Sequence, residues 1–107
     1  MAQLKKFATG TGKVVYAERE IRTLKLVDVY NTDRYRNKNH DRFEFRDNEN
    51  KYYYDATLNA EMTEYDSKIA KDLMCEEGKF IKLSGYFVPI DDYIYIYNPR
   101  LLEIQEN

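Results

Sequence analysis

Apolar and polar residues alternate along much of the chain, and this period of two predicts a protein built mainly of β-strands. The alternation is strict at 42–46, where Phe43 and Phe45 share one face, and at 93–97. The turn-forming segment 47–50 predicts a hairpin between the strands that flank it. Strands are expected at 24–30, 42–46, 51–57, 80–90 and 93–97, the last continuing through 99–104.

One amphipathic helix of three to four turns is predicted between the third and fourth of these strands. Three apolar side chains recur at four-residue spacing and therefore fall on one helix face: Tyr65, Ile69 and Leu73. Thr63, followed three positions later by Asp66, resembles a capping box at the start of the helix. Gly78 is expected to end the helix in the left-handed conformation.

Two stretches near the N-terminus leave alternatives open. Residues 1–12 are polar apart from a few positions and predict either a flexible arm or a short irregular edge strand. The charged stretch 18–20 predicts either an exposed turn or a bulge within one long strand. The length of 107 residues suits a single domain, 1–107.

The predicted order is strand, strand, strand, helix, strand, strand. Over about Leu24–Ile104 this order resembles that of OB-fold nucleic-acid-binding domains, including the single-stranded DNA-binding proteins of bacteria and phages. The resemblance implies a mostly β fold with one helix, a five-stranded OB-type Greek-key barrel. Because 103–107 is not a long acidic tail, a small phage or mobile-element version is expected rather than the bacterial one.

The composition indicates that any nucleic-acid binding depends on a local group of residues and not on the charge of the whole chain. The chain has 17 basic and 19 acidic residues and a formal net charge of −2, so no overall positive field attracts nucleic acid. It contains 11 tyrosines, five phenylalanines and no tryptophan. Since each tyrosine hydroxyl needs a partner or water, many of these rings are expected at the surface or in an interface.

The cation-rich segment 34–42 and the hairpin after it are the candidate nucleic-acid-binding region. In OB-fold binders the loop between the first two strands grips the nucleic acid, so the resemblance implies this role here. A solvated loop kept soluble by its charge is the alternative. The phase of 52–54 is open, so either Tyr53 or its two neighbours could face outward. The predicted nucleic-acid-binding residues are Arg34, Tyr35, Arg36, Lys38, Arg42, Arg46, Lys51 and Tyr53.

A tyrosine ladder on the last strand is the candidate protein interface. If Ile94 and Ile96 face inward, the alternating tyrosines face outward, and tyrosine is enriched at protein interfaces. The neighbouring pair Asp91–Asp92 would repel phosphates, which favours a protein partner or a homodimer over DNA here. Cross-strand packing is the simpler alternative. The predicted interface residues are Tyr86, Tyr93, Tyr95 and Tyr97.

Nothing in the sequence predicts catalysis, a cofactor or a metal site. His40 lies in a polar loop, and Cys75, within the predicted helix, is expected to be a small, partly buried side chain. The adjacent acids at 76–77 and 91–92 lack ligand spacing, and 10–13 lacks the strand and helix of a phosphate-binding loop.

Two functions are therefore expected. The first is non-catalytic binding of single-stranded DNA or RNA. The alternative is a protein-binding OB domain, such as a small phage-encoded inhibitor or an assembly subunit. Since no apolar stretch approaches the ~20 residues of a membrane span, a cytoplasmic location without membrane contact is expected.

Overall fold

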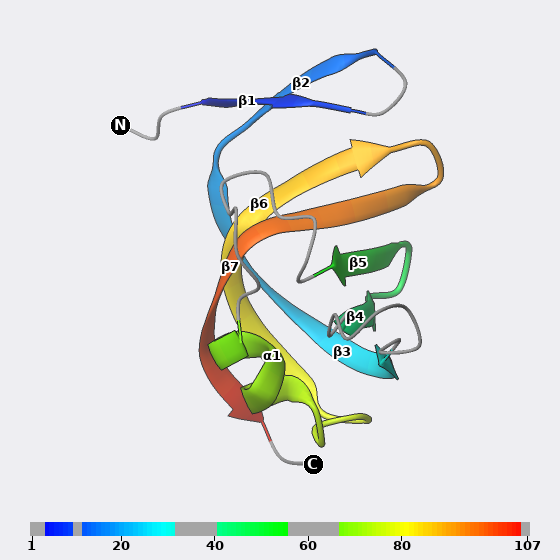
Figure 1. The fold of residues 1–107 in the computed structure, drawn as a ribbon, viewed down its shortest axis with the longest axis vertical. Helices are drawn as coiled ribbons and strands as arrows, with labels where there is room; N and C mark the ends of the chain where they lie inside the picture. The colour runs from blue at the N-terminus through cyan, green and yellow to red at the C-terminus, as the bar shows by residue number, and fades with distance from the viewer. Residues whose placement is uncertain (1–3, 10–11, 32–40, 56–66, 106–107) are drawn as a thin grey trace.

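A computed structural model describes residues 4–9, 12–31, 41–55 and 67–105 of the chain (Figure 1). The described part is mostly β-structure, as the alternation predicts, with a five-stranded closed barrel and a separate two-stranded sheet. The elements are β1 Lys5–Ala8, β2 Val14–Ala17, β3 Arg19–Asn31, β4 Asp41–Arg46, β5 Lys51–Asp55, α1 Ser67–Leu73, β6 Phe80–Ile90 and β7 Tyr93–Gln105.

The barrel strands follow the order β3-β4-β5-β7-β6, and β3 closes the ring by pairing with both β4 and β6. Neighbouring strands are antiparallel except β5 and β7, which run parallel and pair at Tyr52–Ile94 and Tyr53–Tyr95. The long strands β6 and β7 curve from the hairpin side of the molecule to the side of α1 (Figure 1).

The barrel interior is filled by the alternate residues of its strands. Phe43 and Phe45 of β4 and Tyr52 and Tyr54 of β5 are at most 1% exposed, so Tyr53 faces outward. The helix α1 adds its apolar side to the same core. The other buried members of this core are Leu24, Leu26, Ile69, Leu73, Ile81, Leu83, Phe87 and Ile96.

β6 and β7 bend where they cross in close contact. A Cβ atom on Gly85 would lie 3.2 Å from Cγ2 of Ile96, closer than ordinary packing, so a glycine suits this approach. On β7, Asn98 has a φ of 51°, which marks a local irregularity in the strand. Arg19 spans the bend, donating from one guanidinium nitrogen to Ser84 Oγ at 3.1 Å and from the other to the Asn98 carbonyl at 2.9 Å.

The N-terminal strands β1 and β2 form an antiparallel hairpin that packs on the outside of the barrel. Phe7 is 2% exposed, and its ring lies 5.3 Å from that of Tyr86 and 4.9 Å from that of Tyr97. Ala17 and Val88 complete this second apolar cluster. Residues 5–8 are thus a paired strand, and Phe7 is the large side chain that the hairpin buries against the barrel.

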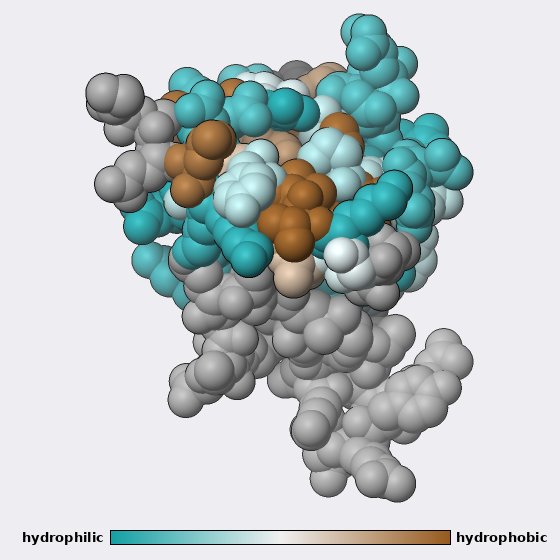
Figure 2. Space-filling model, turned by 90° about the horizontal axis from the view of Figure 1, so that it is seen from above, coloured by the Kyte–Doolittle hydropathy of each residue, from teal (hydrophilic) through white to brown (hydrophobic). Residues whose placement is uncertain are grey.

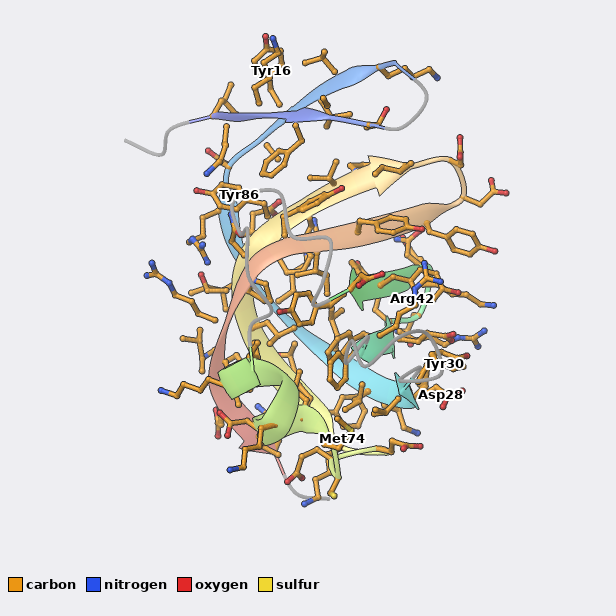
Figure 3. All side chains as sticks on the ribbon, in the orientation of Figure 1. Tyr16, Asp28, Tyr30, Arg42, Met74 and Tyr86 are labelled. Carbon is orange, nitrogen blue, oxygen red and sulfur yellow. The ribbon has the colours of Figure 1, made fainter. Side chains whose placement is uncertain are left out.

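The opposite side of the hairpin carries exposed apolar side chains. Leu4, Val14 and Tyr16 are 65%, 46% and 60% exposed. Figure 2, which views the molecule from the hairpin side, shows apolar patches set among hydrophilic surface. Tyr16 lies on the side of the hairpin that is turned away from the barrel (Figure 3).

The helix differs from its predicted form. The described helix ends at Leu73, before the predicted stop at Gly78, and its predicted cap at Thr63 lies outside the described residues. Gly78 does have a positive φ of 89°, but its N–H donates to the Leu26 carbonyl at 2.7 Å, so it joins a turn onto β3. Cys75 lies in that turn and is exposed, so the expectation of partial burial was wrong.

The strand boundaries in the N-terminal part of the chain differ from the sequence prediction. Only Glu18 separates β2 from β3, and the bulge of β3 lies between Leu26 and Asp28 instead of at 18–20. β6 ends at Ile90, as predicted, and the turn before β7 consists of Asp91 and Asp92. β7 is one continuous strand. No helix in the described part of the chain combines the length and apolar character needed to span a bilayer.

We expect Phe7→Ala to release the hairpin and leave the barrel folded. Deleting a buried phenyl ring costs about 3–5 kcal/mol where its surroundings cannot relax. The hairpin can open as a local unit, so most of that cost should appear there. Because 1.4 kcal/mol is tenfold in an equilibrium constant, amide hydrogen exchange in β1 and β2 should accelerate by about two orders of magnitude.

Hydrogen exchange measured by mass spectrometry checks this expectation. Leu4→Ala, at an exposed position of the same hairpin, is the control and should leave exchange unchanged. An equal acceleration throughout β3–β7 in Phe7→Ala would mean that hairpin and barrel unfold together, contrary to this expectation.

Candidate functional site

The outer face of β4, β5 and β7 gathers aromatic and charged side chains around Tyr53. Because Tyr52 and Tyr54 point into the core, Tyr53 points out. The strand register places it opposite Glu44 on β4 and Tyr95 on β7. Tyr53 is therefore the centre of this face.

Three tyrosine rings and one guanidinium group are in contact there. The Tyr53 ring lies 5.1 Å from that of Tyr93, edge to face, and 5.9 Å from that of Tyr95. The Cζ atom of Arg42 lies 4.5 Å from the Tyr53 ring centroid, and its guanidinium donates to the Tyr95 hydroxyl at 3.1 Å. We call Arg42, Tyr53, Tyr93 and Tyr95 the arginine–tyrosine cluster.

Two rings beside the centre keep much of their surface open to solvent. Tyr93, within the cluster, is 39% exposed, and Tyr30, which pairs with Arg42 across β3 and β4, is 41% exposed. Tyr30, Asp28 and Arg42 lie on the same side of the molecule (Figure 3). A planar ligand could therefore stack on Tyr30 or Tyr93 without displacing the core of the cluster.

Two hydroxyl groups of this face, those of Tyr53 and Tyr30, have a raised pKa. Burial, followed by the charge of Glu44, raises the pKa of Tyr53, and the opposing effect of Arg42 is smaller. A hydrogen bond with Asp28 is the main reason that the pKa of Tyr30 is raised. Both hydroxyls are therefore neutral hydrogen-bond donors at physiological pH.

A row of cations lies beside the cluster. Arg46 on β4 pairs with Lys25 on β3 and with Lys51 on β5, so three basic residues cross the sheet side by side. The Arg46 side chain is half exposed, and its Nε lies 3.5 Å from Oε2 of Glu44. A hollow of about 210 Å³ opens at the β4–β5 turn between Arg46 and Lys51. We call Lys25, Arg46 and Lys51 the basic row.

The predicted nucleic-acid-binding residues divide into two groups. Four of them, Arg34, Tyr35, Arg36 and Lys38, lie outside the described residues. The other four share the outer face described above: Arg42, Arg46, Lys51 and Tyr53.

The predicted protein-interface tyrosines also divide, although they lie on adjacent strands. Tyr93 and Tyr95 belong to the arginine–tyrosine cluster, next to the predicted nucleic-acid-binding residues. Tyr86 and Tyr97 contact Phe7 beneath the hairpin, and burial raises the pKa of Tyr97. The proposed ladder is thus interrupted by the hairpin.

Sequence reasoning missed two residues of this face, Tyr30 and Lys25. Both precede β4 on β3, and their neighbours depend on how β3 is registered against β4. The bulge between Leu26 and Asp28 shifts that register. The alternation within 24–30 predicts a strand, but it does not predict where the bulge lies.

A second polar cluster at the β4–β5 turn fixes the orientation of β5. The Tyr52 hydroxyl donates to Asp47 Oδ2 at 2.6 Å and accepts from Arg22 at 2.9 Å. Asp47 Oδ1 accepts from the backbone N–H groups of Glu49 at 2.8 Å and Asn50 at 2.7 Å. The inward direction of Tyr52 is thereby anchored, and with it the outward direction of Tyr53.

Ionisation follows from these bonds. Desolvation tends to raise the pKa of Asp47, but the hydrogen bonds from Tyr52 and the turn, with the charge of Arg22, lower it overall. Burial and then the hydrogen bond to Asp47 raise the pKa of Tyr52, against the effect of Arg22. Asp47 is therefore a carboxylate and Tyr52 a neutral donor at neutral pH.

Comparisons of the chain with protein-family models, with curated proteins and with solved structures found no match. Within the described ranges, no group of three or more His, Cys, Asp or Glu side chains could hold a metal ion.

We expect Tyr52→Phe to destabilise the protein by about 1–2 kcal/mol at neutral pH, because two hydrogen bonds to charged groups are lost. The folded-state pKa of Asp47 lies below its ordinary value of 3.8. Ionised Asp47 therefore stabilises the protein fully at pH values above 3.8. This stabilisation is lost as the pH falls through the lowered pKa of the folded state. The stability difference between wild type and variant should therefore narrow below pH 3.8.

Urea denaturation at a series of pH values measures this difference. Tyr16→Phe, which removes a hydroxyl from an exposed ring on β2, is the matched control and should change stability little at any pH. If the stability difference between wild type and Tyr52→Phe stayed constant down to acid pH, the charge of Asp47 would not contribute to the stabilisation by Tyr52.

Proposed function

We propose that the chain is a non-catalytic protein that binds single-stranded DNA or RNA over the outer face of β4, β5 and β7. The arginine–tyrosine cluster is the observation that carries this proposal. Its exposed ring and its guanidinium plane offer stacking surfaces to unpaired bases, and stacking is tolerant of base sequence. The neighbouring basic row supplies the charges that would meet phosphates.

An OB-type Greek-key barrel is the architecture that we propose for β3–β7. This assignment is supported by five strands in one ring, by a helix between the third and fourth of them, and by parallel pairing of the third and fifth. OB domains bind oligonucleotides on the face of strands two and three. In the proposed arrangement these strands are β4 and β5, which carry Arg42 and Tyr53.

Charge on this face differs from charge on the whole chain. The net charge of −2 gives little long-range attraction to a polyanion. Binding would therefore depend on the short-range contacts of the basic row and the cluster. Arg34, Tyr35, Arg36 and Lys38 come shortly before β4 in the chain, and we propose that they also bind nucleic acid.

A protein-binding role is the second candidate, and the outer side of the hairpin favours it. Leu4, Val14 and Tyr16 are all strongly exposed there, and grouped apolar side chains on a surface are typical of protein contacts. In this alternative the partner is another protein or a second copy of the chain. The hairpin, not the arginine–tyrosine cluster, would then be the contact.

Fluorescence anisotropy with a short labelled oligo-dT, at low and high salt, tests the first proposal. We expect binding that prefers single strands over duplex and weakens as salt increases. Tyr93→Ala should weaken binding by about 5- to 100-fold, since one stacked base contributes ~1–3 kcal/mol. Arg46→Glu should weaken binding and reduce its dependence on salt.

Matched variants separate these effects from general ones. Tyr16→Ala removes a ring on the hairpin that is more exposed than that of Tyr93, and Arg100→Glu makes the same charge reversal on an exposed arginine of β7. Both should keep most of the wild-type affinity. Absence of binding at low salt both to oligo-dT and to a single strand that contains all four bases would overturn the proposal. If Arg46→Glu and Arg100→Glu lost equal amounts of affinity, the basic row would have no specific part in the proposed binding.

A further inference from the structure

A carboxylate stands at the centre of the proposed nucleic-acid-binding face. Glu44 pairs with Tyr53 of β5 on one side and with Asp28 of β3 on the other. Its side chain is 12% exposed and keeps a small open surface among the rings. Two acidic residues therefore lie side by side where a stacked base would come to rest.

The described partners of Glu44 belong to the same face and are held loosely. The Tyr30 hydroxyl donates to its Oε1 at 3.5 Å, and Arg46 Nε lies 3.5 Å from its Oε2. A Tyr53 hydrogen bond to Glu44 also contributes to the raised pKa of Tyr53. Because both of these 3.5 Å distances lie at the long limit of hydrogen bonding, a closer donor on a ligand could replace Tyr30 and Arg46.

The arrangement of charge orients a bound strand. Phosphates would be repelled from Glu44 and Asp28 and attracted to the basic row, which lies two residues further along β4 at Arg46. Two residues along a strand span about 7 Å. The sugar–phosphate backbone is thus expected over the basic row, with its bases directed toward Tyr53 and Glu44.

Base edges differ in how well they suit a carboxylate, which accepts hydrogen bonds and donates none. Guanine presents two adjacent donors, N1–H and the N2 amino group, which match the two carboxylate oxygens. Thymine and uracil present a single N–H between two carbonyl oxygens. A carboxylate repels these carbonyl oxygens. We propose, building on the function proposed above, that Glu44 makes this face select guanine in single strands.

Anisotropy competition with three oligonucleotides tests the selection. One is all thymine, one carries guanine at central positions, and one carries inosine there, which lacks the N2 amino group. A bidentate contact to a base discriminates by about 5- to 100-fold, so the guanine strand should compete better than the all-thymine strand by that factor. The inosine strand should fall between them.

Glu44→Gln is the decisive variant, because it keeps the shape of the side chain and removes one of the two acceptors. The ratio of guanine to thymine affinity should approach one, while all-thymine binding is retained or strengthened. Glu103→Gln makes the same change of charge at an exposed position on β7 and should leave the ratio unchanged.

Each other outcome has a distinct meaning. Equal binding of all three strands by wild type would overturn guanine selection and leave single-strand binding intact. If Glu44→Gln strengthened all three strands by one common factor, Glu44 would act only as a repulsive charge, and the inference would be overturned. Failure of every strand to bind would overturn single-strand binding and guanine selection together.

Discussion

Closure of the barrel depends on a short parallel contact between β5 and β7, and the outer face depends on that contact. Its register sets Tyr52 beside Ile94 and Tyr53 beside Tyr95. A slip by one residue would turn each side chain of β5 to the opposite side of the sheet, exposing the core and burying Tyr53. The hydrogen bonds of the Tyr52 hydroxyl to Asp47 and Arg22 oppose such a slip, because they are available only when Tyr52 points inward.

The same residue type has three roles in this protein, and strand phase assigns them. Tyr52 spans from the core to a charged network at the β4–β5 turn. Tyr86 and Tyr97 pack against Phe7 of the hairpin. Tyr53 and Tyr93 form part of the outer cluster. A count of 11 tyrosines predicts that many hydroxyls need polar surroundings. It does not predict which tyrosine takes which of these three roles.

The features that could be predicted are those that contrast apolar and polar positions locally. The inward direction of Phe43 and Phe45 follows from charged neighbours on either side, and the structure confirms it. The run 52–54 has no such contrast, so its phase comes from pairing with β4 and from the hydrogen bonds of Tyr52 at the β4–β5 turn. Phe7 of the hairpin is buried against Tyr86 and Tyr97, which come about 80 to 90 positions later in the chain. Its docking is thus a tertiary effect that local patterns do not encode.

Mixed charge on the outer face has a consequence for any nucleic-acid ligand. Three cations of the basic row lie beside Asp28 and Glu44, so the fields of these opposite charges partly cancel. Salt screens the remaining field beyond a Debye length, about 10 Å at moderate salt. Such a face gives little steering from a distance, in keeping with the net charge of −2. Affinity would then come from stacking and from hydrogen bonds formed at contact. A binder of this kind would distinguish strands by their bases more than by their phosphates, which all strands share.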